Sequence, residues 1–180
     1  MSNAAKSPVE VTWKIEKTGT TLEISYEIEN RSGELIHVLD QTIIPQERGI
    51  ELAPMRAIVR NDAPGVVSIV KGHIRPRAGQ AVGSEYTPGS RPLENGKKVA
   101  GMASIPLPLV AWHPYMTMQP LAKDPTQAVL EIGYLTSDPP KGRKEWDEEP
   151  LVTGGKMKIP SLAYVLERQK IVKTMPLPLP

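Results

Sequence analysis

Histidine is the first residue type to consider for chemistry, because it binds metals and transfers protons near neutral pH. The chain has three, His37, His73 and His113, and they lie far apart in the sequence. A zinc site usually takes at least two ligands from closely spaced positions, and no His-x-His or His-x-x-x-His pair occurs. Cysteine is absent, which excludes thiolate ligands, a cysteine nucleophile and disulfides. The sequence therefore predicts no metal site and no cofactor.

Serine and carboxylate side chains form no catalytic pattern either. Ser84 and Ser90 each follow a glycine but lack the Gly-x-Ser-x-Gly elbow of serine hydrolases. Asp147, Glu148 and Glu149 are adjacent, so they cannot all face one cleft as paired catalytic carboxylates do. No glycine-rich phosphate-binding loop occurs. We therefore expect a protein that is not an enzyme; the alternative is an enzyme whose residues meet only in space, with a histidine and a carboxylate in a deep pocket.

Large aromatic and sulfur-containing side chains gather in a segment that is too rich in proline to form a helix, at residues 105–120. Tryptophan and tyrosine in loops commonly anchor protein interfaces, because they cover a large area at a low cost in entropy. We predict a partner-binding surface on this loop, joined by one tryptophan from a second, polar loop. Its residues are Trp112, His113, Tyr115, Met116, Met118 and Trp146.

Two other interpretations of these aromatic residues stay open. Exposed, coplanar rings of Trp112, Tyr115 and Trp146 could stack on sugars, as in a carbohydrate-binding module. Alternatively, the loop folds back and fills an open end of the core, for which methionine is well suited. The exposure of Trp112 separates them, since a fully buried Trp112 cannot anchor a partner.

Composition indicates one globular domain. The 180 residues are 39% hydrophobic and 23% charged, with 19 prolines and no phenylalanine. The net charge is +2, and residues 56–98 carry eight basic against three acidic residues. We interpret this bias as a solvated sheet face and do not expect nucleic-acid binding. No run approaches the ~20 apolar residues of a membrane span.

Strict alternation of apolar and polar residues predicts a hairpin near the start of the chain. Residues 9–16 and 22–29 both alternate, which is typical of strands with one wet and one dry face, and residues 18–20 (Thr-Gly-Thr) suit a tight turn.

The rest of the chain has the pattern of short strands separated by proline and glycine. A strand at residues 35–44, ending at Pro45, is expected to be covered on both faces or bulged, because its apolar residues do not alternate. Residues 127–135 are expected to return to alternation. Residues 75–92 and 137–150 are expected to be loops. The other expected strands are at residues 55–60, 66–74, 80–86, 97–105 and 168–174, the last after one short helical turn.

The two ends of the chain are set apart from the domain. Residues 1–7 have no apolar core and are not a signal peptide, and Ser-Asn-Ala at 2–4 is typical of tag cleavage, so we expect this stretch to be disordered or tag-derived. The sequence does not decide between a cytoplasmic protein and a periplasmic or extracellular one whose export signal has been removed. Residues 175–180 (Met-Pro-Leu-Pro-Leu-Pro) are polyproline-like and predict an arm that packs on this domain or on a neighbour.

Together these patterns predict a single all-β domain at residues 8–174, an antiparallel immunoglobulin-like β-sandwich of about eight strands with long Pro-rich loops. The run Leu-Glu-Asn-Gly-Lys at 93–97 before a strand, then a Pro-rich connection, then residues 127–135, is similar in general style to bacterial immunoglobulin-like accessory domains. That resemblance implies an architecture and carries over no functional residue. The predicted function is a non-enzymatic binding or structural module that engages a protein partner through the 105–120 loop. A homodimer through a sheet edge is a second way to associate.

Overall fold

A computed structural model describes residues 7–75, 87–113, 116–121, 124–136 and 146–180. Within these residues the protein consists of strands, connecting turns and one short helix, so the all-β prediction is confirmed. The described part contains sixteen strand segments, where about eight were expected. The expected strand at 80–86, residues 1–6 and most of the expected loop at 137–150 lie outside the described residues.

A three-stranded antiparallel sheet confirms the predicted hairpin. Strand β1 (Val9–Thr18) pairs along its whole length with β2 (Thr21–Asn30), and β2 pairs with β9 (Lys98–Pro106). Gly19, with a φ of 59°, makes the turn between β1 and β2, in a left-handed conformation that glycine adopts without strain. Alternation predicts this hairpin well because each strand buries one face only.

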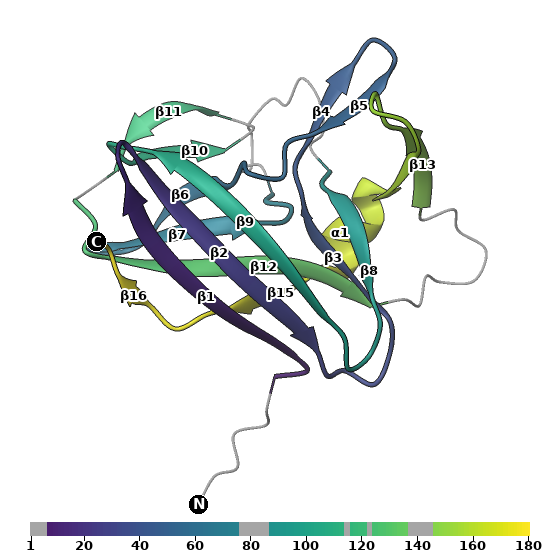
Figure 1. The fold of residues 1–180 in the computed structure, drawn as a ribbon, viewed down its shortest axis with the longest axis horizontal. Helices are drawn as coiled ribbons and strands as arrows, with labels where there is room; N and C mark the ends of the chain where they lie inside the picture. Colours follow the sequence, from purple (N-terminus) through teal and green to yellow (C-terminus); the bar gives the residue numbers. More distant parts are fainter. Residues whose placement is uncertain (1–6, 76–86, 114–115, 122–123, 137–145) are drawn as a thin grey trace, which may run out of the picture.

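The second sheet has nine strands. They are β3 (Ile36–Gln41), β6 (Ile58–Ala63), β7 (Val66–Lys71), β8 (Gly89–Leu93), β10 (Val110–His113), β11 (Met116–Pro120), β12 (Gln127–Thr136), β15 (Lys170–Lys173) and β16 (Leu177–Pro178). Their order is β11-β10-β6-β7-β12-β3-β8, and β15 and β16 also pair with β12 (Figure 1). β7 and β12 run parallel, so the expectation of a wholly antiparallel arrangement is wrong for this pair.

Strand β12 is the centre of this sheet and pairs with four strands, β7, β3, β15 and β16. All its residues except the first and last are buried. The predicted alternation at residues 127–135 is therefore wrong, because both faces of β12 are covered. β3 is buried throughout its length and has an irregular register against β8, as expected for a strand whose apolar residues do not alternate.

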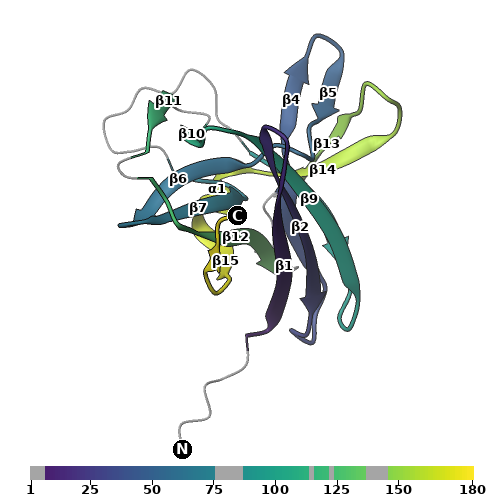
Figure 2. The same ribbon diagram turned by 60° about the vertical axis from the view of Figure 1, so that its left-hand side comes forward.

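The main core lies between the two sheets, which face each other in Figure 2. β2 supplies Leu22, Ile24, Tyr26 and Ile28 from the small sheet. The large sheet contributes residues of β3, β7 and β12 that point toward the small sheet. They are Ile36, Val38, Val67, Ile69, Ala128, Leu130, Ile132 and Tyr134. Burying each large aliphatic side chain contributes roughly 1.5–3 kcal/mol to folding.

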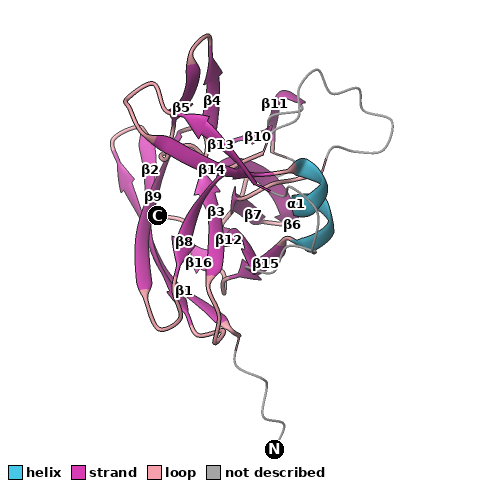
Figure 3. Ribbon diagram, turned by 90° about the vertical axis from the view of Figure 1, so that its right-hand side faces the viewer, coloured by secondary structure: helices cyan, strands magenta, loops and turns pink. Residues whose placement is uncertain are grey.

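A second, smaller core lies on the other side of the large sheet, beneath helix α1 (Leu162–Arg168) (Figure 3). Leu39 and Leu135 of the sheet contact Tyr164 and Val165 of the helix there. The Ser161 side chain caps the helix by accepting a hydrogen bond of 3.2 Å from the backbone N–H of Tyr164. The expected short helical turn followed by a terminal strand is confirmed by α1 and β15.

Two hairpins extend the molecule, and a bridge between Ile50 and Leu151 joins them. β4 (Ile43–Gln46) pairs with β5 (Gly49–Leu52), and β13 (Trp146–Pro150) pairs with β14 (Lys156–Pro160). Pro45 was expected to end a strand but lies inside β4, in a two-stranded hairpin with no other strand paired to it among the described residues. The end of the expected polar loop at 137–150 is likewise a strand, β13.

The last residues of the chain lie against the large sheet. Leu177 and Pro178 form β16 beside Ala128 and Gln127, so the proline-rich arm packs on its own domain. Within the described residues, no helix has the length and apolar character needed to cross a membrane.

Candidate functional site

The predicted partner-binding segment forms two short strands at one end of the large sheet. β10 pairs with β6 through Trp112 and Val59, and β11 follows as the last strand in the order. The chain enters β10 through a cis peptide bond between Leu107 and Pro108. Much of the described part of residues 105–120, predicted as a loop, is therefore strand, in β10 and β11.

Trp112 is half-buried, so it is neither fully covered by the core nor fully exposed. It lines a cavity of about 310 Å³ together with Ile105, Pro106, Pro108 and Val110. Arg56 and Ser104 are the polar side chains of this wall. The cavity is therefore a mainly apolar hollow with one aromatic ring and a few polar groups at its margin.

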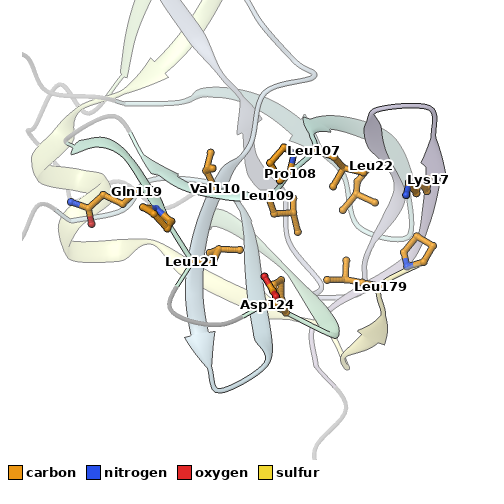
Figure 4. Close-up of a pocket in the computed structure, with 13 residues that line it drawn as sticks. Lys17, Leu22, Leu107, Pro108, Leu109, Val110, Gln119, Leu121, Asp124 and Leu179 are labelled. Atoms are coloured by element: carbon orange, nitrogen blue, oxygen red, sulfur yellow. The ribbon is translucent and has the colours of Figure 1, made fainter.

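A second cavity, of about 530 Å³, shares Pro108 and Val110 with the first (Figure 4). Its wall is built from leucines and prolines of the β9–β10 connection, of the end of β11 and of the C-terminal arm. These include Leu107, Leu109, Pro120, Leu121, Leu179 and Pro180, with Lys17, Gln119 and Asp124 as the polar residues. The two cavities together make an apolar cleft on both sides of the Pro108–Val110 corner, and we call this surface the corner cleft.

Most of the other predicted site residues belong to the same strands. His113 ends β10, and Met116 and Met118 lie in β11. Tyr115 lies outside the described residues. The structure thus brings Trp112 and the two methionines into one pair of neighbouring strands.

Trp146, by contrast, lies at the start of β13, well apart from β10 in Figures 1 and 2. Its ring centroid is 4.3 Å from that of His37 and 5.9 Å from that of Tyr164, which it meets edge-on. It packs against the second core. The structure therefore does not bring Trp112 and Trp146 together on one surface.

A buried polar cluster lies between the two sheets, and the sequence analysis missed it. The Asp40 carboxylate accepts hydrogen bonds from the Tyr26 hydroxyl at 2.9 Å, from Arg91 Nε at 2.9 Å and from Gln41 Nε2 at 2.9 Å. Arg91 also donates to the carbonyl of Ala100 at 2.9 Å. Burial raises the pKa of the Tyr26 hydroxyl, and the Asp40 charge raises it further. The cluster therefore holds a neutral phenol and a charge pair between the sheets.

Lys71 extends this buried polar region. Its ammonium donates to the carbonyls of Pro54 and Arg56, the latter at 2.7 Å, and the residue is 2% exposed. Burial lowers the pKa of Lys71 to about 8, although the Asp40 charge opposes this shift. Because backbone carbonyls hold the ammonium in a closed site, Lys71 is suited to bracing the chain at residues 54–56.

The histidines are placed apart. The His37 ring packs against Trp146 with an angle of 42° between the ring planes. Burial lowers the pKa of His37, and the charge of Lys158 lowers it further. His73 is buried just after β7. Among the residues that the structure describes, no three histidine, aspartate or glutamate side chains gather to hold a metal ion.

One sequence signal could have found the buried polar groups. Asp40 follows Val38 and Leu39, Lys71 follows Ile69 and Val70, and Glu131 lies between Leu130 and Ile132. Each of the three charged residues is no more than 3% exposed. Charged residues are almost never fully buried unless they are paired. A lone charge in an apolar strand therefore indicates a buried partner, although it does not say which one.

Comparison of the chain with protein-family models, with curated proteins and with solved structures gives no match.

Proposed function

We propose that this protein is a non-enzymatic binding module, an immunoglobulin-like β-sandwich whose corner cleft receives an extended, proline-containing segment of a partner protein. The observation that carries the proposal is the cleft itself, an apolar hollow on each side of the Pro108–Val110 corner with the half-buried Trp112 on one wall.

The occupant is inferred from what already lies there. The chain's own Leu179 and Pro180 line the larger cavity, and the backbone N–H of Leu179 donates to the carbonyl of Thr126 at 2.9 Å. A Leu-Pro sequence in extended form therefore fits this wall. The smaller cavity, with Trp112 beside two prolines, offers a similar surface that the arm does not line.

Proline-containing segments suit such a cleft for physical reasons. They are already extended before binding, so little conformational entropy is lost, and they dock on aromatic-lined grooves. The walls of the cleft are formed by short strands and prolines, whose conformation is already fixed. Binding therefore costs less conformational entropy. Trp146 has no part in this proposal, because its ring packs against the second core.

The test uses a defined peptide, acetyl-Pro-Leu-Pro-Leu-Pro-amide, and the full chain labelled with ¹⁵N. The protein has three tryptophans, so their indole N–H signals report separately on three places. We expect saturable shifts of the Trp112 indole signal only. Trp112→Leu should weaken binding about ten-fold or more. Trp146→Leu is the matched control and should bind like the wild type, after circular dichroism has shown that both variants are folded.

A chain shortened after Thr174 adds a second readout. Removing the arm uncovers the wall of the larger cavity, so the same peptide should bind it more tightly than it binds the full chain. Equal binding by Trp112→Leu and the wild type, or an equal response to acetyl-Ala-Leu-Ala-Leu-Ala-amide, would contradict the proposal.

A further inference from the structure

A third cavity, of about 600 Å³, lies against the face of the large sheet that points away from the main core. Along β12, Leu130 and Ile132 face the main core, so Glu131 between them faces the other way. Val70 and Lys173 stand beside Glu131 in register and share that face. The volume is within the range of small-molecule pockets, which is about 300–1,000 Å³.

Buried groups on this face fix an arginine at the cavity. Ser68 donates to one oxygen of Glu131 at 2.7 Å, and the Arg60 guanidinium donates to the other at 2.7 Å. The Glu131 side chain is 4% exposed, whereas that of Arg60 is 43% exposed. The carboxylate thus holds one end of Arg60, and the rest of the guanidinium remains open to the cavity and to solvent.

A second arginine, Arg75, lines the same cavity and is held by a bond to the backbone carbonyl of Leu166 in α1. Within the described residues it forms no ion pair. The charged residues that line the cavity are therefore Arg60, Arg75 and Glu131, which leaves one positive charge in excess. Lys173, nearby, pairs with Asp62 at 2.6 Å and with Glu131 at 3.6 Å, so its positive charge is balanced by Asp62 and the excess at the cavity stays at one.

The wall between these groups is rigid. The Gln169 side-chain amide bonds the backbone of His73 at both ends, accepting from its N–H and donating to its carbonyl at 2.9 Å each. The Gln169 side chain can take this position only because residue 133 is glycine. A Cβ on Gly133 would lie 2.6 Å from Gln169 Oε1. A fixed wall lowers the entropic cost of binding a ligand.

Between the polar groups the lining is apolar, with Val70, Ile74, Ala111 and Ile171. We propose that this cavity binds a small organic anion that carries a single carboxylate on an apolar body. One excess positive charge suits a monoanion, and the buried Glu131 disfavours a dianion such as a phosphate monoester. The carboxylate would pair with Arg75 and the open edge of Arg60, and the body would cover Ile74 and Ile171, the latter of which is 50% exposed.

The experiment titrates the ¹⁵N-labelled full chain with octanoate and with phenylacetate. Both ligands carry one carboxylate, attached to an alkyl chain in the first and to a benzyl group in the second. The neutral amides, octanamide and phenylacetamide, are the matched ligands. We expect at least one of the two acids to shift the backbone signals of Gly133 and Ile171 saturably at millimolar concentration, and its amide to bind about ten-fold more weakly or worse. Affinity should fall as salt is raised, because Arg75 is exposed.

Arg75→Gln should weaken binding of that acid about ten-fold, and Arg75→Lys should restore part of the loss. Arg48→Gln, in the exposed turn between β4 and β5, is the matched control and should bind like the wild type. The proposal is overturned if neither acid shifts these signals, if acids and amides bind equally, or if Arg75→Gln binds as the wild type does. None of these outcomes depends on whether the corner cleft binds a peptide.

Discussion

Three neighbouring strands of the large sheet, β7, β12 and β3, each contain a buried charged residue. Asp40 lies in β3, Lys71 ends β7 and Glu131 lies in the middle of β12. Each is buried and each has partners that satisfy its charge or its hydrogen-bonding groups. Removing one partner leaves the other buried and unpaired, which costs more than the pair itself contributes.

Asp40→Asn tests whether a buried charge is costly once its pairing is removed, at the Tyr26–Asp40–Arg91 cluster between the sheets. The change removes the charge that Arg91 needs and alters the acceptor of the Tyr26 hydroxyl. We expect the free energy of unfolding to fall by about 3–5 kcal/mol in urea titrations. Asp62→Asn, which alters a more exposed pair with Lys173, is the control and should cost at most about 1 kcal/mol. Similar losses in the two variants would mean that the Asp40 cluster adds nothing beyond a surface pair.

Lys71 makes stability depend on pH in the alkaline range. Its pKa in the folded protein is about 8, against 10.5 for an ordinary lysine, so the folded state binds fewer protons than the unfolded state between these values. The contribution of Lys71 to the free energy of unfolding therefore rises as pH is raised from 8 toward 10.5, by on the order of 3 kcal/mol in total.

The measurement is the difference in unfolding free energy between the wild type and Lys71→Met, followed from pH 7 to pH 10. We expect the difference to shift in favour of the wild type across this range. Tyr26 acts in the opposite sense at higher pH, because its raised pKa means that stability is lost once the unfolded state ionises above about pH 10. A difference that stays constant with pH would show that Lys71 keeps its proton in the folded state.

At the scale of strand pairs, Tyr26 and Gly101 stand directly opposite each other in β2 and β9. The Tyr26 ring lies across the glycine, and a Cβ at position 101 would come within 2.3 Å of ring atom Cζ. Gly101→Ala should therefore displace the ring and strain its bond to Asp40, at a cost of about 2–4 kcal/mol. A double-mutant cycle with Tyr26→Ala measures this: the alanine at 101 should cost little once the ring is gone. Additive losses would contradict the explanation.

Alternation predicts strands only where one face is wet. The hairpin of β1 and β2 follows from the sequence because its outer faces are exposed. β3, β7 and β12 are covered on both faces, so apolar and polar residues do not alternate along them and the sequence gives no register. The parallel pairing of β7 with β12 joins segments that lie far apart in the chain, and no local pattern indicates it.

The same limit applies to the candidate sites. Trp112 could be selected from its residue type and its proline-rich surroundings, and it does line a cavity. Trp146 was selected for the same reasons but packs on His37 and Tyr164, contacts that depend on the β13–β14 hairpin lying beside α1. The cavity with Arg60 and Arg75 was missed, because its lining comes from six separate stretches of sequence.

For the whole molecule, we expect the two sheets to resist local unfolding more strongly than the β4–β5 hairpin does. The sheets share the main core and the Tyr26–Asp40–Arg91 bonds, whereas β4–β5 is a two-stranded unit with mostly exposed or half-exposed residues. A two-stranded hairpin is marginally stable by itself, and β5 is joined to the β13–β14 hairpin by a bridge between Ile50 and Leu151. In native-state hydrogen exchange, amides of β4–β5 should exchange through local opening, while those of β2 and β12 should exchange only on global unfolding. Equal protection in both sets would show that the hairpin unfolds only with the rest.

The pairing of β12 also has a consequence during synthesis. Val66 of β7 pairs with Gln127 of β12, and His37 of β3 pairs with Leu135 of β12. At translation rates of roughly 5–20 residues per second, β7 waits several seconds or more for β12 to leave the ribosome. Throughout that delay an apolar, β-branched strand stands with one edge open, the condition under which nascent chains aggregate or need a chaperone. Ribosomes paused before residue 127 should therefore carry a nascent chain that remains sensitive to protease, and release of the last fifty residues should let the large sheet close.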